Sequence, residues 1–234
     1  MNAIAIITAR GGSKRIPRKN LRPFLGKPII AYSIAAALES GLFSEVMVST
    51  DDAEIADVAR SCGASVPMMR SAKNSDDHAT TADVLMEVMA AYRANGATFE
   101  FACCIYPTAP FVTAERLRRA FAILDETQAD TVLPISAFSF PIWRSFRREG
   151  NRVHFNWPEY APRRSQDLEP AFQDAGQFYF FRSEALEASG SLITANTIGI
   201  EVPGKEVQDI DSEEDWELAE MKFALLAKAD QAGC

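Results

Sequence analysis

The stretch Ile4-Ala-Ile-Ile-Thr-Ala-Arg-Gly-Gly-Ser-Lys-Arg-Ile-Pro-Arg-Lys-Asn20 decides the fold that we expect of this chain. It begins with an apolar run that stops at glycine, which is typical of a buried parallel β-strand. Gly11 and Gly12 permit positive φ angles and let backbone N–H groups approach a ligand closely. A strand followed by such a turn predicts an α/β fold with a ligand site at the end of the strand.

Positive charge is concentrated directly after this strand. Seven lysines and arginines lie between Arg10 and Lys27, and no acidic residue precedes Glu39, although the chain carries a net charge of −8. Backbone donors surrounded by permanent positive charge suit a polyphosphate. The alternative is a glycine turn followed by a solvated basic surface. The loop matches neither a Walker A motif nor the Gly-x-Gly-x-x-Gly dinucleotide turn, so it does not decide the question alone.

The composition describes an ordinary globular protein. Its 234 residues suit one large domain over residues 1–234, and 47% hydrophobic residues can form a sizeable core. The acidic balance argues against a general nucleic-acid-binding protein and against binding to anionic membranes. No stretch has the length of a transmembrane helix, and we find neither a signal peptide nor a metal-binding cysteine pattern. A cytoplasmic protein is expected.

Strand-like and helix-like segments alternate along the chain, which indicates βαβ units and a mostly parallel sheet with flanking helices. Right-handed crossovers would place the loops after successive strands at one edge. The first loop and the loop with Asp51 and Asp52 should therefore be neighbours. The expected strands are 4–9, 46–48, 101–106, 131–135, 177–181 and 198–202, and the expected helices include 29–40, 82–95, 184–188 and 213–228.

Residues 138–175 interrupt this alternation. Aromatic residues alternate with arginines here, and the helical period disappears. Aromatic and arginine enrichment is common in the cores of protein interfaces. We expect a small β-rich insertion that mediates homodimerisation, or that closes over a substrate, and the net acidity disfavours a nucleic-acid surface.

Two aspartates precede the last helix. Alternation places Asp209 and Asp211 on one face of an extended strand at residues 207–211, with Ile210 facing the core. Neighbouring carboxylates repel each other unless a cation lies between them. Mg²⁺ shared with substrate phosphates would meet this need. The alternative is that Asp211 only begins the helix and that Asp209 is solvated. A basic loop with a carboxylate pair is the minimum equipment for nucleotidyl transfer.

Several motifs together resemble the acylneuraminate cytidylyltransferase family over nearly the whole chain. They are residues 9–14, 16–20, 26–28, 49–52, 107–110 and 209–216. Sialate-activating members usually have glycine after the Ser-Lys of the first motif, where this chain has Arg15. Residues 76–83, 164–168 and 174–179 are more similar to the members that activate pseudaminic acid.

The resemblance implies a Rossmann-like nucleotide-diphospho-sugar transferase fold and a nucleotidyltransferase. Such an enzyme would convert CTP and pseudaminate, a nine-carbon sugar acid, to CMP-pseudaminate and pyrophosphate with Mg²⁺ or Mn²⁺. The product would serve surface-glycan or flagellin glycosylation. The enzyme alternatives are N-acetylneuraminate, legionaminate and 3-deoxy-octulosonate cytidylyltransferases. A nucleotide-sensing module is the alternative outside the enzymes, but it would have no use for a carboxylate metal site.

The resemblance also implies roles for individual residues by motif position. The residues that would bind the nucleotide are Ala9, Arg10, Gly11, Gly12, Ser13, Lys19, Asn20, Arg70 and Thr81. The residues that would lie near the sugar are Tyr106, Gln177, Tyr179 and Phe180. The metal would be held by Asp209 and Asp211, and the catalytic residues would be Arg10, Lys19 and Asp211. No side chain is nominated as the sole general base.

Overall fold

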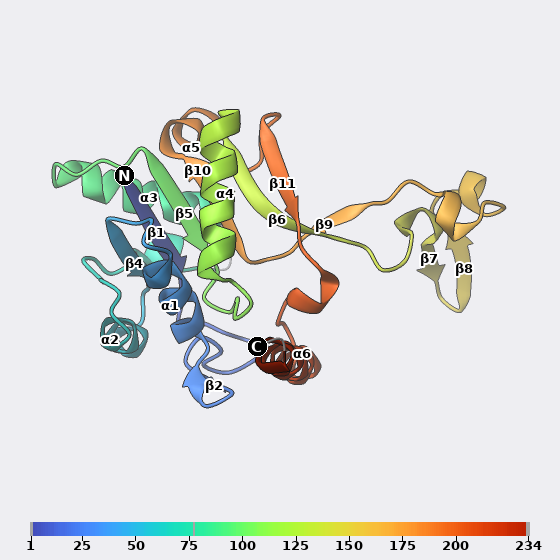
Figure 1. Ribbon diagram of the computed structural model, residues 1–234, viewed down its shortest axis with the longest axis horizontal. Coiled ribbons are helices and arrows are strands. Elements are labelled where there is room, and N and C mark those ends of the chain that lie inside the picture. The colour runs from blue at the N-terminus through green and yellow to red at the C-terminus, as the bar shows by residue number, and fades with distance from the viewer. Residues whose placement is uncertain (1, 77, 233–234) are drawn as a thin grey trace.

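The fold is built around a central sheet of seven strands (Figure 1). The structure is a computed structural model that describes residues 2–76 and 78–232. Residue 77, within the expected motif 76–83, lies outside the described residues. The strands are β1 (Ala3–Thr8), β4 (Glu45–Ser49), β5 (Phe101–Ile105), β6 (Thr131–Ala137), β9 (Phe172–Asp174), β10 (Phe178–Arg182) and β11 (Thr197–Glu201). Their order is β11-β6-β10-β5-β1-β4, and β9 pairs with β6 outside this path.

Most of the sheet is parallel, as the alternation of strands and helices predicts. β1 pairs in parallel with β4 and β5, and β11 pairs in parallel with β6. β10 is the exception in the middle of the sheet, because it runs antiparallel to both β5 and β6. The beginning of β10 therefore lies at the edge where β1, β4 and β5 end, and Phe178 pairs with Ile105 there.

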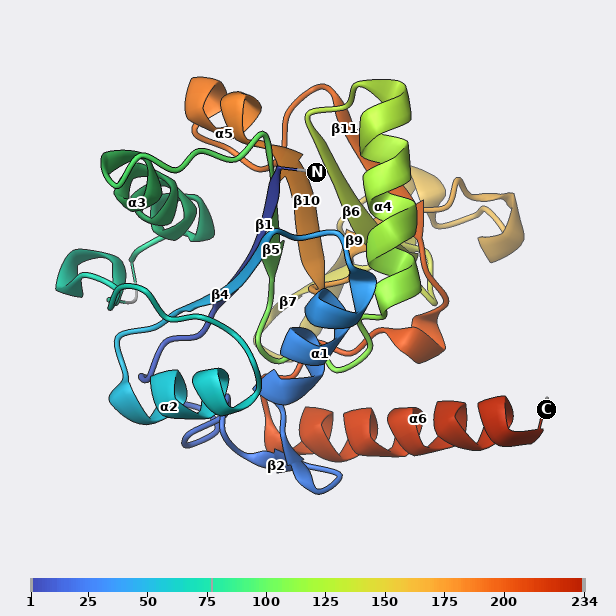
Figure 2. The same cartoon turned by 60° about the vertical axis from the view of Figure 1, so that its left-hand side comes forward.

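Helices cover both faces of the sheet (Figure 2). The helices on the two faces are α1 (Ile30–Ser40), α2 (Ala53–Ser61), α3 (Thr81–Ala94), α4 (Ala114–Thr127) and α5 (Ser183–Ser189), whereas α6 (Glu213–Ala232) lies beyond the end of the sheet. Alternate residues of β1 divide the core: Ala5 and Ile7 pack with α1, α2 and α4, whereas Ile4 and Ile6 pack with α3 and α5. This period of two is what a strand buried on both faces requires. Within the described residues, no helix has the length and apolar character needed to span a membrane.

Side-chain caps fix several helix starts where the sequence places them. Thr80 and Asp83 form a capping box at the start of α3, and Thr113 accepts the Arg116 N–H at the start of α4. Ser212 and Asp215 exchange the corresponding hydrogen bonds before α6.

A separate apolar cluster joins the first loop to the end of the chain. It lies where α6 meets the small hairpin of β2 (Pro23–Phe24) and β3 (Lys27–Pro28), and it buries Ile16, Ile210 and Trp216. The expected strand at residues 207–211 is wrong, because this segment lies outside the sheet and follows the 3-10 turn η5 (Gly204–Glu206). The alternation is nevertheless real, since Ile210 is buried between two more accessible aspartates.

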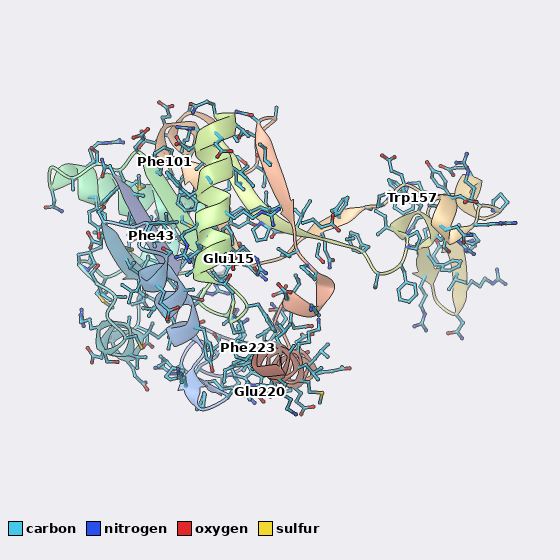
Figure 3. All side chains as sticks on the ribbon, in the orientation of Figure 1. Phe43, Phe101, Glu115, Trp157, Glu220 and Phe223 are labelled. Atoms are coloured by element: carbon cyan, nitrogen blue, oxygen red, sulfur yellow. The ribbon has the colours of Figure 1, made fainter. Side chains whose placement is uncertain are left out.

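Residues 138–171, which we call the arm, leave the main body between β6 and β9 (Figure 1). The arm contains a hairpin of β7 (Phe146–Glu149) and β8 (Arg152–Phe155). Three 3-10 turns accompany it, namely η2 (Ile142–Arg144), η3 (Pro158–Tyr160) and η4 (Ser165–Asp167). Trp143 packs against Trp157 and Tyr160, so the arm has an aromatic cluster of its own, away from the body (Figure 3).

Candidate active site

The first loop (residues 9–20) starts where β1 ends and is tied to the loop after β4. The Ala9 N–H donates to the Ser49 carbonyl at 2.9 Å, and the Gly11 N–H donates to the Asp51 carboxylate at 2.8 Å. The two loops are therefore neighbours, as right-handed crossovers predict.

Gly11 is needed for space and not for a left-handed backbone. Neither Gly11 nor Gly12 has a positive φ angle, so the expected use of that freedom is wrong. A Cβ atom at Gly11 would lie 2.9 Å from the Asp52 side chain, whereas one at Gly12 would meet no atom within 4 Å. Gly11 thus lets the two loops touch, and Gly12 faces open space.

The left-handed residue of this loop is Arg18, whose φ angle is 53°. Its guanidinium pairs with the carboxylates of Asp52 and Glu54. The hydrogen bond from Arg18 lowers the pKa of Asp52 below its ordinary value. Asp52 also accepts the Ile55 N–H at 3.0 Å as the N-cap of α2. Arg18 therefore fastens the first loop to the start of α2.

A cavity of about 490 Å³ opens beside the first loop. It is lined by Arg10, Gly11, Gly12, Ser13, Lys14, Pro17, Arg18, Ser75 and Asp76. Four of the expected nucleotide contacts, residues 10–13, are among them. Asn20 is not, because it is buried behind the loop and donates its side-chain amide to the Arg10 carbonyl at 2.8 Å. Asn20 thereby shapes the loop from within.

The first loop meets the carboxylate segment that is almost two hundred residues away in the sequence. Lys19 Nζ donates to the Ile210 carbonyl at 2.6 Å and lies 3.5 Å from the Asp211 carboxylate. The Arg15 guanidinium lies 2.7 Å from the same carboxylate oxygen. Two cations of the loop therefore converge on Asp211.

A second cavity, of about 410 Å³, opens beside Asp211. It is lined by Tyr106, Pro107, Thr108, Asp174, Gly176, Tyr179, Asp209 and Asp211. Burial and the neighbouring Asp211 carboxylate raise the pKa of Asp209, and Lys19 opposes this effect. A further cation beside the two carboxylates would relieve their repulsion, so this donor pair fits a hard divalent ion.

The carboxylate pair would not complete a metal site by itself. Among residues 2–76 and 78–232, no group of three or more His, Cys, Asp or Glu side chains is arranged to hold a metal ion. The remaining ligands would come from substrate phosphates and water, which is common for Mg²⁺.

Two tyrosines form an aromatic wall in this second cavity. The rings of Tyr106 and Tyr179 meet edge to face, with centroids 5.9 Å apart. The Tyr179 hydroxyl donates to the Asp174 carboxylate, and burial together with this bond raises the pKa of Tyr179 far above its ordinary value. Thr81, at the start of α3, interacts with the Tyr106 hydroxyl. Asp174 was not predicted as a site residue, although it begins the motif at residues 174–179.

The expected ligand contacts Phe180, Gln177 and Arg70 line neither cavity. Phe180 is fully buried on the opposite face of β10 and stacks on Phe43 at 5.5 Å, so its expected place near the sugar is wrong. Gln177 is also buried, and its amide is used inside the protein. Arg70 donates to the hydroxyl and the carbonyl of Ser49, at the end of β4, and does not line either cavity. The period of two along β10 would have separated Phe180 from Tyr179 in advance.

Comparison with known proteins agrees with this geometry. A cytidylyltransferase family model matches residues 4–189. A pseudaminic acid cytidylyltransferase of Campylobacter jejuni is 38% identical over 95% of this chain and 97% of its own. A CMP-N,N'-diacetyllegionaminic acid synthase of Legionella pneumophila is 34% identical over 98% of this chain and 99% of its own.

Solved structures show the same fold. A CMP:2-keto-3-deoxy-manno-octonic acid synthetase, solved in complex with CTP, has a TM-score of 0.70 and 21% sequence identity. The match covers 98% of this chain and 100% of that chain. The family model and the curated relatives extend over most of the sequence, and this chain belongs to the cytidylyltransferase family.

Proposed function

We propose that this chain transfers the CMP group of CTP to pseudaminic acid and releases pyrophosphate in the cytoplasm, where CTP is available. The observation that carries the proposal is the convergence of Arg15 and Lys19, both from the first loop, on Asp211, which lines the second cavity. One cavity has the backbone and charge of a phosphate site, and the other has the tyrosines and carboxylates of a sugar and metal site. The similarity to the Campylobacter jejuni enzyme supports pseudaminic acid as the acceptor.

The first loop would bind the triphosphate. Gly12 has no atom within 4 Å of a notional Cβ, so a phosphate oxygen can approach the backbone at this residue. Arg10 and Ser13 line the same cavity. Lys19, whose ammonium is fixed by the Ile210 carbonyl, would neutralise the phosphates nearest the carboxylates.

Asp209 and Asp211 would hold Mg²⁺, or Mn²⁺, in the second cavity, which both carboxylates line. The bound ion would supply charge neutralisation at the α-phosphate and lower the pKa of the sugar hydroxyl. Arg15 and Lys19 would orient the Asp211 carboxylate toward the triphosphate.

The reaction would be an in-line displacement at phosphorus. The anomeric hydroxyl oxygen of the sugar forms a bond to the α-phosphorus, the bond to the pyrophosphate oxygen breaks, and the hydroxyl proton passes to solvent. Tyr106 and Tyr179 would hold the sugar ring beside Asp209. Positioning and charge stabilisation supply most of the acceleration in reactions of this kind.

A pyrophosphate-release assay with CTP and a panel of sugar acids tests the proposal. We expect pseudaminate to be used best among pseudaminate, legionaminate, N-acetylneuraminate and 3-deoxy-octulosonate. Asp211→Ala should lower kcat roughly a thousandfold, because ligation and charge worth several kcal/mol are lost. It should leave CTP binding in place. Glu214→Ala, at an exposed acid in the first turn of α6, is the control. A near-normal rate for Asp211→Ala would refute the metal assignment, and a preference for another acid would refute the acceptor.

We also infer that the arm contacts a second copy of the chain. Its apolar side chains are unusually accessible for a protein surface, with Phe140 81% exposed and Phe146 54% exposed. Light scattering should give a dimer for the wild type and a monomer for a Phe140→Ser, Phe146→Ser double variant. A wild-type monomer at micromolar concentration would contradict the inference.

A further inference from the structure

The segment that carries the proposed metal ligands, residues 204–211, lies outside the sheet between β11 and α6. Metal ligands need to be held within a narrow range of positions, and loops hold them less firmly than strands do. Hydrogen bonds from neighbouring elements must therefore fix this segment.

Arg116 of α4 binds residues 204–211 from one side, through Glu206. Its side chain is 13% exposed, and its guanidinium pairs with the Glu206 carboxylate. It also donates to the Phe111 carbonyl at 2.9 Å and to Gln177 Oε1 at 3.1 Å. One half-buried cation therefore joins the start of α4, the start of β10 and the turn before the aspartates.

Gln177 closes this network. Its side-chain Nε2 donates to the Glu206 carbonyl at 2.7 Å, and its backbone carbonyl accepts the Tyr106 N–H at 2.9 Å. Both ends of the side-chain amide are thus used, and the residue is 2% exposed. The flanking residues Tyr106 and Tyr179 line the proposed sugar cavity. The network consequently connects the carboxylate segment to the aromatic wall.

Lys222 of α6 forms hydrogen bonds to the same segment from another element. Its ammonium donates to the carbonyls of Gly204, at 3.2 Å, and Val207, at 2.7 Å. It also donates to Gln208 Oε1 at 3.0 Å. Each of the three N–H donors of the ammonium thus has an acceptor. The three acceptors lie along the turn that leads to Asp209.

We propose that Arg116 and Lys222 are positioning residues for nucleotidyl transfer, which hold the 204–208 turn so that Asp209 and Asp211 face the first loop. Neither residue lines either cavity of the site, so both act through the turn. Arg116 instead lines a cavity of about 650 Å³ on the other side of the turn, between α1, α4 and α6. The inference rests on the proposed function, because the metal-binding role of the aspartates belongs to it.

A purely structural role would have a different signature. A buried ion pair that only stabilises the fold would lower the melting temperature when broken and leave metal binding by the folded protein unchanged. A positioning role moves the metal ligands, so metal affinity and kcat change together while the KM for CTP changes little.

The test compares Arg116→Met and Lys222→Met with Arg119→Met in the full chain. Arg119 is exposed on the next turn of α4 and lines the same large cavity, which makes its variant a matched control. The probe is Mn²⁺, titrated by calorimetry in the presence of CTP. We expect each of the first two variants to weaken Mn²⁺ binding about tenfold and to lower kcat up to about a hundredfold, with the KM for CTP within about twofold. Arg119→Met should match the wild type.

The conservative variant Arg116→Lys keeps a cation beside Glu206 and should recover part of the Mn²⁺ affinity. If Arg116→Met does not fold, Lys222→Met tests the same turn from the opposite side. The proposal is overturned if the folded variants bind Mn²⁺ as the wild type does, or if Arg119→Met loses as much. A wild type that binds Mn²⁺ but releases no pyrophosphate with any sugar acid would refute the proposed function, and the Mn²⁺ comparison would still decide the positioning role.

Discussion

Replacing Gly11 with alanine tests whether stability and CTP binding require the close contact between the first loop and the loop after β4. The new Cβ would lie 2.9 Å from Asp52 Cβ and Oδ2, and ordinary contacts begin near 3.4 Å. The two loops must therefore separate by about 0.5 Å, which is the difference between these distances. Overpacking of this kind costs about 1–3 kcal/mol.

Either way of relieving the contact breaks a hydrogen bond. If Asp52 moves, it gives up Arg18 and the cap on Ile55, and a lost cap alone costs about 1 kcal/mol. If the loop moves, the Gly11 N–H loses the Asp51 carboxylate. A total near 2 kcal/mol corresponds to a fall in Tm of roughly 4–8 °C for a chain of this size. Displaced loop N–H groups should also raise the Kd for CTP about tenfold, since 1.4 kcal/mol is one power of ten.

Gly12→Ala provides the internal control for this experiment. Its Cβ meets no protein atom within 4 Å, so thermal unfolding should give a Tm within about 1 °C of the wild type. Calorimetric titration should nevertheless show weaker CTP binding, because the methyl group stands where the phosphates are proposed to approach. A wild-type Tm for Gly11→Ala, or equal losses of Tm for the two variants, would refute the explanation of Gly11 by contact with Asp52.

Three further variants test Asp52 and two residues of β10. Arg18 lowers the folded pKa of Asp52, so its ionised form stabilises the fold above the unfolded pKa and this contribution is lost as the pH falls through the folded value. Urea unfolding should therefore show a flatter acid limb for Asp52→Asn than for the wild type between about pH 5 and pH 2, and equal slopes would contradict this. Phe180→Leu should lower stability by about 1–3 kcal/mol with the KM for the sugar unchanged, because the ring is buried in the core. Tyr179→Phe should raise the KM for the sugar severalfold, because it frees Asp174 from its hydrogen bond, and the opposite assignment of these effects would overturn the placement of the two rings.

The elements that the sequence predicts well are those whose signals are local. The start of α4 at Thr113 and the capping exchange of Ser212 with Asp215 depend on residues three positions apart. The direction of β10 could not be predicted in this way, because an apolar run such as residues 177–181 suits a parallel or an antiparallel neighbour equally. Its reversal is set by a connection through the arm and β9, which no local pattern encodes.

The candidate site divides in the same way. The neighbourhood of the loops after β1 and β4 follows from a topological rule, and the contact of Gly11 with Asp51 confirms it. The partners of Arg15 and Arg18 do not follow from any rule, because each pairs with an acid that is distant in the sequence. A basic stretch read from the sequence therefore overstates the charge that is free to meet a ligand.

Apolar residues, more than charges, bring the carboxylates to the first loop. Ile16 and Ile210 are each 1% exposed and lie in one cluster with Trp216. Burial of one such side chain is worth roughly 1.5–3 kcal/mol. The ion pair of Arg15 with Asp211 is worth about 0–1 kcal/mol, because the Arg15 side chain is 70% exposed to screening solvent. Packing of the two isoleucines thus places Arg15 close to Asp211, while the ion pair between these two residues stays weak. Under the proposed function, Arg15 would therefore exchange Asp211 for a substrate phosphate at little cost, as a site that binds and releases a polyanion requires.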